Sequence, residues 1–150
     1  KPVQNPLPVW IGASADTPVK RAARLADGWL IDPGQPLAVC EQRVNFYRQA
    51  LQEYNRTVTE FPIRRDVYIA ADHETAKQHS DPILQAGYRG FQGERLSALI
   101  IGSPDEAIAE VEKYAALGCN HFLIRHIVRD QAQMLSSIQL MGEKVIPAFS

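Results

Sequence analysis

The sequence has only two cysteines, Cys40 and Cys119, which lie far apart and outside any metal-ligand spacing. This scarcity argues against a disulfide framework and against a zinc site, and it favours a reduced, cytoplasmic protein. Long hydrophobic runs are also missing, since none approaches the roughly 20 residues that cross a bilayer. The first ten residues do not resemble a signal peptide, so a membrane location is not expected.

An excess of charge of one sign is absent as well. The chain has 16 Lys and Arg against 17 Asp and Glu, a formal charge of −1, and no block of like charge. Nucleic acid is therefore not an expected partner, because phosphates would require a basic stripe. What is present is 45% hydrophobic residues in 150, enough for one core. The chain lacks an initiator methionine and opens on a proline-rich stretch, so we expect a piece of a longer protein.

Short apolar segments alternate with helical patterns along the chain. The apolar segments predict strands at residues 9–11, 29–31, 63–71 and 121–125. The periodic segments predict helices at residues 17–26, 37–54, 104–117 and 131–141. Thr17 is expected to cap the first helix, and Ser103 with Glu106 to form a capping box. Residues 73–93 contain Pro82 and several glycines, and they predict broken helical pieces and loop.

This alternation predicts an α/β fold with a parallel sheet covered by helices. Four strand–helix units share 150 residues, whereas a closed (β/α)8 barrel needs about 250. We therefore expect half of a TIM barrel, with a small open sheet as the alternative. Half a barrel has two unpaired strand edges, so a second copy or a missing N-terminal half must cover it.

Three blocks of sequence resemble one known family. The run PVWIGASADTPVKRAARLADGWL, residues 8–30, resembles the fifth-strand segment of the luciferase-like flavin monooxygenases, the bacterial luciferase superfamily. The run IIGSPDEAIAEVEKYAALGCNHFLIR, residues 100–125, is similar to the family's Gly-Ser-Pro motif, helix, glycine and final strand, and GEKVIPAF, residues 142–149, is similar to its closing segment. The blocks follow the order that the family has.

The resemblance implies a (β/α)8 barrel that binds FMN, or a deazaflavin in related members, at the strand C-termini. It identifies this chain as strands five to eight, a single C-terminal half-barrel unit over residues 1–150. The implied function is the flavin-binding part of a monooxygenase, which oxygenates a small organic substrate using reduced flavin and oxygen. Such a part is expected to be inactive without the N-terminal half or a partner chain. A deazaflavin-dependent hydride-transfer enzyme and a non-catalytic, self-associating half-barrel that binds flavin or another phosphate-bearing ligand are the alternatives.

The turn after the first strand is the main candidate for cofactor binding. A helix begins directly after a buried strand there, which leaves backbone N–H groups and the positive end of the helix dipole pointing outward. Gly12 and Ala13 allow close approach of a ligand, and Ser14 and Thr17 offer hydroxyls. The resemblance places the flavin phosphate near this turn. The alternative is that Ser14, Asp16 or Thr17 only caps the helix.

Charged residues on the later strands form a second group of candidates. Arg125 ends the last strand, where it is expected to bind a flavin phosphate or an anionic substrate, or to form a structural ion pair. His126 is the one candidate for proton transfer, and no other catalytic residue is identified. Arg64, Arg65 and Asp66 lie within a strand and are interpreted as structural: they are expected to pair with carboxylates of neighbouring units or to lie near the bottom of the barrel.

Overall fold

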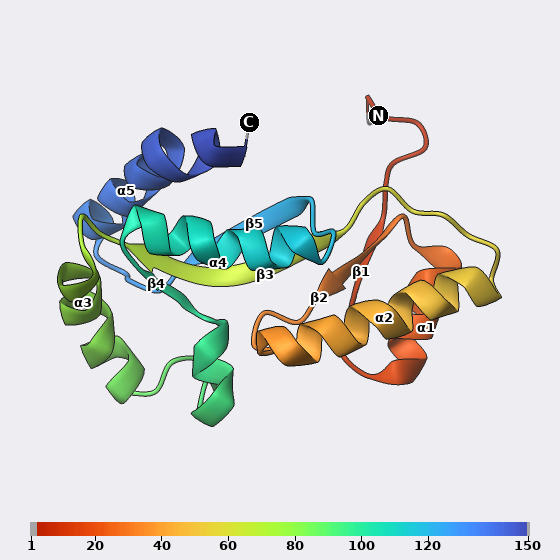
Figure 1. Ribbon diagram of the computed structural model, residues 1–150, viewed down its shortest axis with the longest axis horizontal. Coiled ribbons are helices and arrows are strands. Elements are labelled where there is room, and N and C mark those ends of the chain that lie inside the picture. The colour runs from red at the N-terminus through yellow and green to blue at the C-terminus, as the bar shows by residue number, and fades with distance from the viewer. Residues whose placement is uncertain (1–2, 150) are drawn as a thin grey trace.

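The protein is seen in a computed structural model that describes residues 3–149 (Figure 1). Within this range, strands and helices alternate as the sequence predicts. The strands are β1 (Trp10–Ala13), β2 (Gly28–Ile31), β3 (Pro62–Ile69), β4 (Ile100–Gly102) and β5 (His121–His126). The α-helices are α1 (Asp16–Leu25), α2 (Leu37–Glu53), α3 (His73–Gln85), α4 (Pro104–Ala116) and α5 (Gln131–Leu140). Short 3-10 and π segments follow at Gly93–Ala98 (η1), Met141–Val145 (η2) and Ile146–Phe149 (η3).

All strand pairs in the sheet are parallel, and β3 is its centre. β1 pairs with β2 over four residues, and β3 pairs with β5 over six, from Pro62 opposite His121 to Val67 opposite His126. β2 and β3 share far fewer backbone pairs. Within the described chain only Ile31 opposite Ile63 and an isolated Gly28–Glu60 bridge join them. Figure 1 shows the result: β1 and β2 with α1 and α2 form one part, and the remaining elements form the other.

Two elements differ from the sequence prediction. β4 was not predicted; its three residues pair with the last residues of β3, from Val67 to Ile69, so tertiary pairing makes a strand of a segment too short to be identified alone. Helix α3 was predicted as broken pieces, but it runs unbroken through Pro82. Pro82 lies in its last turn, where the missing N–H removes one backbone hydrogen bond, and the helix ends before Gly87 at φ +90°.

Helix starts are capped in one part of the molecule and open in the other. Ser103 and Glu106 form the predicted capping box on α4, and Asp72 and Asp130 cap α3 and α5. In contrast, α1 begins at Asp16 after Ala15 and has no side-chain cap. The prediction that Thr17 caps this helix is therefore wrong, because the N-cap position is Ala15, two residues earlier, and Thr17 lies inside the first turn.

The helix-covered face of the sheet is the hydrophobic core. Alternate strand residues such as Trp29, Ile31 and Ile63 are fully buried against α1 and α2. Arg65 lies on the same face and is also fully buried, with its guanidinium 4.3 Å from the centre of the Tyr114 ring. Its hydrogen bonds go to the carbonyls of Asp32, Arg64 and Gln35 and to the Cys40 sulfur. The expectation of a carboxylate partner is thus wrong for Arg65: its terminal nitrogens bond to neutral acceptors and its guanidinium faces an aromatic ring, while its buried Nε has no hydrogen-bond partner among the described residues.

The opposite face of the sheet is concave. The rings of Trp10 on β1 and His121 on β5 lie 5.3 Å apart, although β2 and β3 separate their strands. A flat sheet would place strands three steps apart at about 14 Å. The sheet therefore curves as a partial TIM barrel, as predicted from the sequence.

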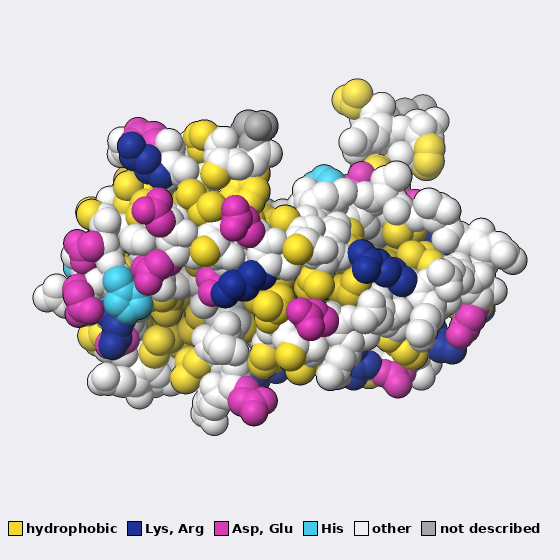
Figure 2. Space-filling view, in the orientation of Figure 1, with side chains coloured by type: hydrophobic (Ala, Val, Ile, Leu, Met, Phe, Trp, Pro, Cys, Tyr) yellow, Lys and Arg dark blue, Asp and Glu magenta, His cyan; other side chains and the backbone are white. Residues whose placement is uncertain are grey.

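The surface keeps apolar side chains exposed. Ile124, Ile146 and Phe149 are among the exposed large hydrophobic residues, and Figure 2 shows yellow side chains gathered beside the C-terminal segment. Within residues 3–149, β1 pairs only with β2 and β5 only with β3, so each has a strand edge without a neighbour. No helix in this range combines the length and apolar character that a membrane span requires.

Candidate functional site

A hollow of about 300 Å³ opens at the C-terminal ends of β1 and β2. Its lining comes from the end of β1 and the turn after it, from the end of β2 and its following loop, and from β3, namely Gly12, Ala13, Ser14, Leu30, Ile31, Asp32, Pro33 and Arg64. Carboxyl ends of parallel strands are where barrels of this type place their sites. The hollow thus joins three of the four turn residues selected from the sequence with an arginine that was not selected.

The start of α1 follows the hollow closely along the chain, since Asp16 comes two residues after Ser14. Because no side chain caps the helix, the N–H groups of its first turn are available to an anion. The carboxylate of Asp16 does not oppose this, since it forms an ion pair with Arg43 on α2. Trp29 on β2 holds the end of β1 in place, because its Nε1 donates a hydrogen bond to the Ala13 carbonyl at 2.9 Å.

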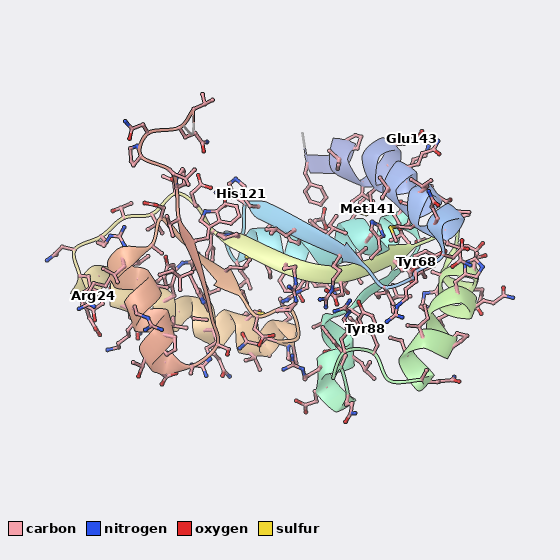
Figure 3. The ribbon with its side chains drawn as sticks, turned by 180° about the vertical axis from the view of Figure 1, so that it is seen from behind. Arg24, Tyr68, Tyr88, His121, Met141 and Glu143 are labelled. Carbon is pink, nitrogen blue, oxygen red and sulfur yellow. The ribbon has the colours of Figure 1, made fainter. Side chains whose placement is uncertain are left out.

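A charged cluster lies beside the hollow on the concave face. The Asp66 side chain is completely buried, and its Oδ2 accepts hydrogen bonds from the Arg125 guanidinium and from the Tyr88 hydroxyl at 2.9 Å. Arg64 Nε lies 3.9 Å from Asp66 Oδ1, and neither of these two buried atoms has a hydrogen-bond partner in the described chain. Figure 3 labels Tyr88 in the segment after α3, below the sheet. One buried carboxylate therefore binds Arg125 and lies close to Arg64 on the concave face.

The pKa values in this cluster shift with its contacts. The hydrogen bond to Asp66 raises the pKa of Arg125, so this guanidinium is permanently charged. Burial, followed by the hydrogen bond to Asp66, raises the pKa of the Tyr88 hydroxyl, which keeps Tyr88 protonated as a donor. At neutral pH, Arg125 is therefore charged and Tyr88 is uncharged.

Several residues predicted from the sequence lie away from the hollow. Thr17 lines a separate groove between α1 and α2, together with Lys20 and Arg24. Arg125 forms the ion pair that was its alternative interpretation. His126 is in register with Val67, whose side chain belongs to the helix-covered core, so His126 is on that side of the sheet. Burial lowers the pKa of His126, which keeps its imidazole neutral.

Arg64 and Asp32 were missed as site residues. Arg64 was interpreted as structural because it stands beside Arg65 and Asp66 in one strand, yet strand alternation turns its side chain to the other face from Arg65. That alternation was a usable signal in the sequence. For Asp32 the only signal was its position directly after the second predicted strand.

The described residues contain no cluster of three or more His, Cys, Asp or Glu side chains that would bind a metal ion. Both cysteines are buried and unpaired. Burial raises the pKa of Cys119 to about 12 and also raises that of Cys40. These thiols are protonated at neutral pH, and neither is a nucleophile there.

Comparisons with known proteins agree with this architecture. The profile of the luciferase-like monooxygenase family matches residues 1–121. A curated relative, the F420-dependent glucose-6-phosphate dehydrogenase of Microbacterium testaceum, is 25% identical over 96% of this chain and 49% of its own length. The chain thus spans about half the length of the curated relatives it matches.

Solved structures show the same fold. The monooxygenase RslO1 of Streptomyces bottropensis superposes with a TM-score of 0.74 and 16% identity, over 94% of this chain and 48% of that one. The coenzyme F420-dependent tetrahydromethanopterin reductase of Methanopyrus kandleri superposes with a TM-score of 0.69 and 19% identity, over 97% of this chain and 52% of that one. The parallel half-barrel and the family profile together establish that this chain belongs to the luciferase-like monooxygenase family.

Proposed function

We propose that this chain is the C-terminal half-barrel of a flavin- or deazaflavin-dependent oxidoreductase and that it holds the cofactor phosphate. The observation that carries the proposal is the hollow that brings Ser14 and Arg64 together beside the uncapped start of α1. This combination of hydroxyl, guanidinium and free backbone N–H groups is the donor set that phosphate needs.

The residues fit such a group on steric grounds as well. A Cβ placed on Gly12 would meet nothing closer than the Leu30 carbonyl at 4.0 Å, so the backbone there is open to a ligand. Arg64 has a side chain that is 35% exposed, and its one ion pair among residues 3–149, with Asp66, is long. Its terminal nitrogens are therefore available to an anion without breaking a strong bond.

Each residue would have a definite task in the bound state. Ser14 would donate its hydroxyl hydrogen bond to a phosphate oxygen, and Arg64 would balance the phosphate charge. Asp66 would hold Arg64 and Arg125 in place from beneath. A bound reduced flavin would supply electrons for oxygen activation, whereas a deazaflavin would supply or accept a hydride.

Of the two reactions, we propose hydride transfer with a deazaflavin first. Its support is that the curated relatives are named F420-dependent dehydrogenases. Oxygenation with FMN is the second candidate and rests on the family's description. Fluorescence titration with F420 and with FMN separates them: tighter F420 binding supports hydride transfer, and binding of FMN alone supports oxygenation.

Placing a negative charge in the hollow should weaken FMN binding. We expect Ser14→Asp to lower FMN affinity at least tenfold, or about 1.4 kcal/mol, because its carboxylate repels the phosphate. Titration of FMN fluorescence measures the effect. Riboflavin, which has no phosphate, should bind both forms equally, and Ser136→Asp on the exposed side of α5 is the matched control. Equal FMN affinity in the Ser14 and Ser136 variants would place the phosphate elsewhere.

The chain alone should self-associate. Two unpaired strand edges and the concave face remain open in one copy. Two copies of the four longer strands β1, β2, β3 and β5 would supply the eight strands of a barrel. Light scattering after size-exclusion chromatography should give a dimer or higher species. A monomer at all concentrations would mean that an N-terminal half is the required complement.

A cytoplasmic location, expected from the reduced cysteines, also stays a proposal.

A further inference from the structure

A second arginine approaches the hollow from a distant part of the chain. Arg95 belongs to η1, and its Nη2 lies 3.4 Å from Asp32 Oδ1. The contact depends on a glycine, since a Cβ placed on Gly34 would come within 2.8 Å of Arg95 Nε and closer still to Cζ. The preceding residues of the same segment place Tyr88 on Asp66. The segment after α3 therefore contacts both carboxylates that flank Arg64.

Asp32 presents a difficulty for an anion in the hollow. It is one of the lining residues, and its Oδ1 accepts the Gly34 N–H at 2.8 Å, which orients the carboxylate. A phosphate beside it would be repelled, and the charges of Asp32 and Arg64 alone would cancel. With Arg95 included, the three side chains carry a net charge of +1. Arg95 thus changes the formal charge of this set of side chains from zero to +1.

The ion pair between Arg95 and Asp32 contributes too little to the stability of the fold to explain its presence. The Arg95 side chain is 46% exposed and that of Asp32 is 26% exposed, and ion pairs at such positions contribute little to folding. We propose that Arg95 is a positioning residue for phosphate binding: it neutralises Asp32 and so makes the hollow cationic. This inference rests on the proposed function, because it concerns the same phosphate.

The test measures FMN affinity in charge variants of the 150-residue chain. Arg95→Gln should weaken FMN binding about tenfold at low salt and less at high salt, because ions screen the repulsion. Riboflavin binding should stay unchanged. The decisive variant is Asp32→Asn combined with Arg95→Gln, which has no ion pair but also no repelling carboxylate. It should bind FMN within about twofold of the original chain. Arg89→Gln, in the same segment without a carboxylate partner among the described residues, is the matched control.

The outcomes separate the inference from the proposed function. If the original chain binds FMN and Arg95→Gln binds it equally well, the role of Arg95 is refuted and the phosphate site stands. If the double variant is as weak as Arg95→Gln, then the contact acts by holding the segment in place and charge compensation is wrong. If the original chain binds neither FMN nor F420, the proposed function fails and this inference fails with it.

Discussion

Replacing Trp29 with alanine should lower the free energy of unfolding by about 3–5 kcal/mol, the range for large aromatic residues in a packed core. Trp29 is completely buried, and its ring lies 5.0 Å from that of Tyr47 and 6.0 Å from that of Phe61. Its removal would leave a cavity between β2 and α2 that the surrounding helices cannot close without moving. Urea unfolding followed by circular dichroism measures the change.

The control for this prediction is Trp29→Phe. It keeps an aromatic ring in the core but removes the Nε1 hydrogen bond to the Ala13 carbonyl. We expect a smaller loss of about 1–2 kcal/mol, together with weaker FMN binding, because Ala13 lines the hollow. Equal stability of the alanine and phenylalanine variants would contradict the assignment of Trp29 to the core.

Replacing Asp66 with alanine should lower the free energy of unfolding by about 2–4 kcal/mol. Removal of one partner from a buried ion pair leaves an uncompensated charge and typically costs 3–5 kcal/mol. The expected loss is somewhat smaller here because the Arg125 side chain is 29% exposed and can turn toward water. The Tyr88 hydroxyl would lose its acceptor as well. Urea unfolding again measures the effect.

An exposed carboxylate provides the comparison for Asp66. Asp81 lies 3.9 Å from Lys77 on the surface of α3, and its side chain is 41% exposed. Asp81→Ala should change the free energy of unfolding by less than about 0.5 kcal/mol. If Asp66→Ala were equally mild, the buried carboxylate would not organise the arginines on the concave face.

Most of the fold could be predicted from the sequence because its signals are local. The capping box at Ser103 and Glu106, the Gly118 stop at φ +94° and the apolar runs of β2, β3 and β5 each specify their own element. The strand that the sequence did not predict, β4, has only three residues and forms through its pairing with β3. For α3, the Asp72 cap and the helical register outweigh the proline in its last turn. Local breakers were thus given too much weight.

The candidate site was only half predictable. The turn at Gly12, Ala13 and Ser14 follows from a helix that begins directly after a strand, which is a local pattern. Arg64 and Arg95 reach the region from positions 50 or more residues away, and no local pattern states which charges will meet. The function of Arg125 was left open between a ligand and an ion pair, and its partner Asp66 lies on another strand.

The thin boundary between β2 and β3 has a mechanical consequence. Backbone pairing there amounts to two bridges among the described residues, whereas β3 and β5 share six register pairs. Side chains must therefore transmit force between the two parts of the arc. Arg65 does so by bonding from β3 to the carbonyls of Asp32 and Gln35, and the ring of Phe61 stacks 5.8 Å from that of Tyr47. Side-chain contacts thus supplement the few backbone pairs between the two parts of the arc, and we expect any bending of the arc to be concentrated there.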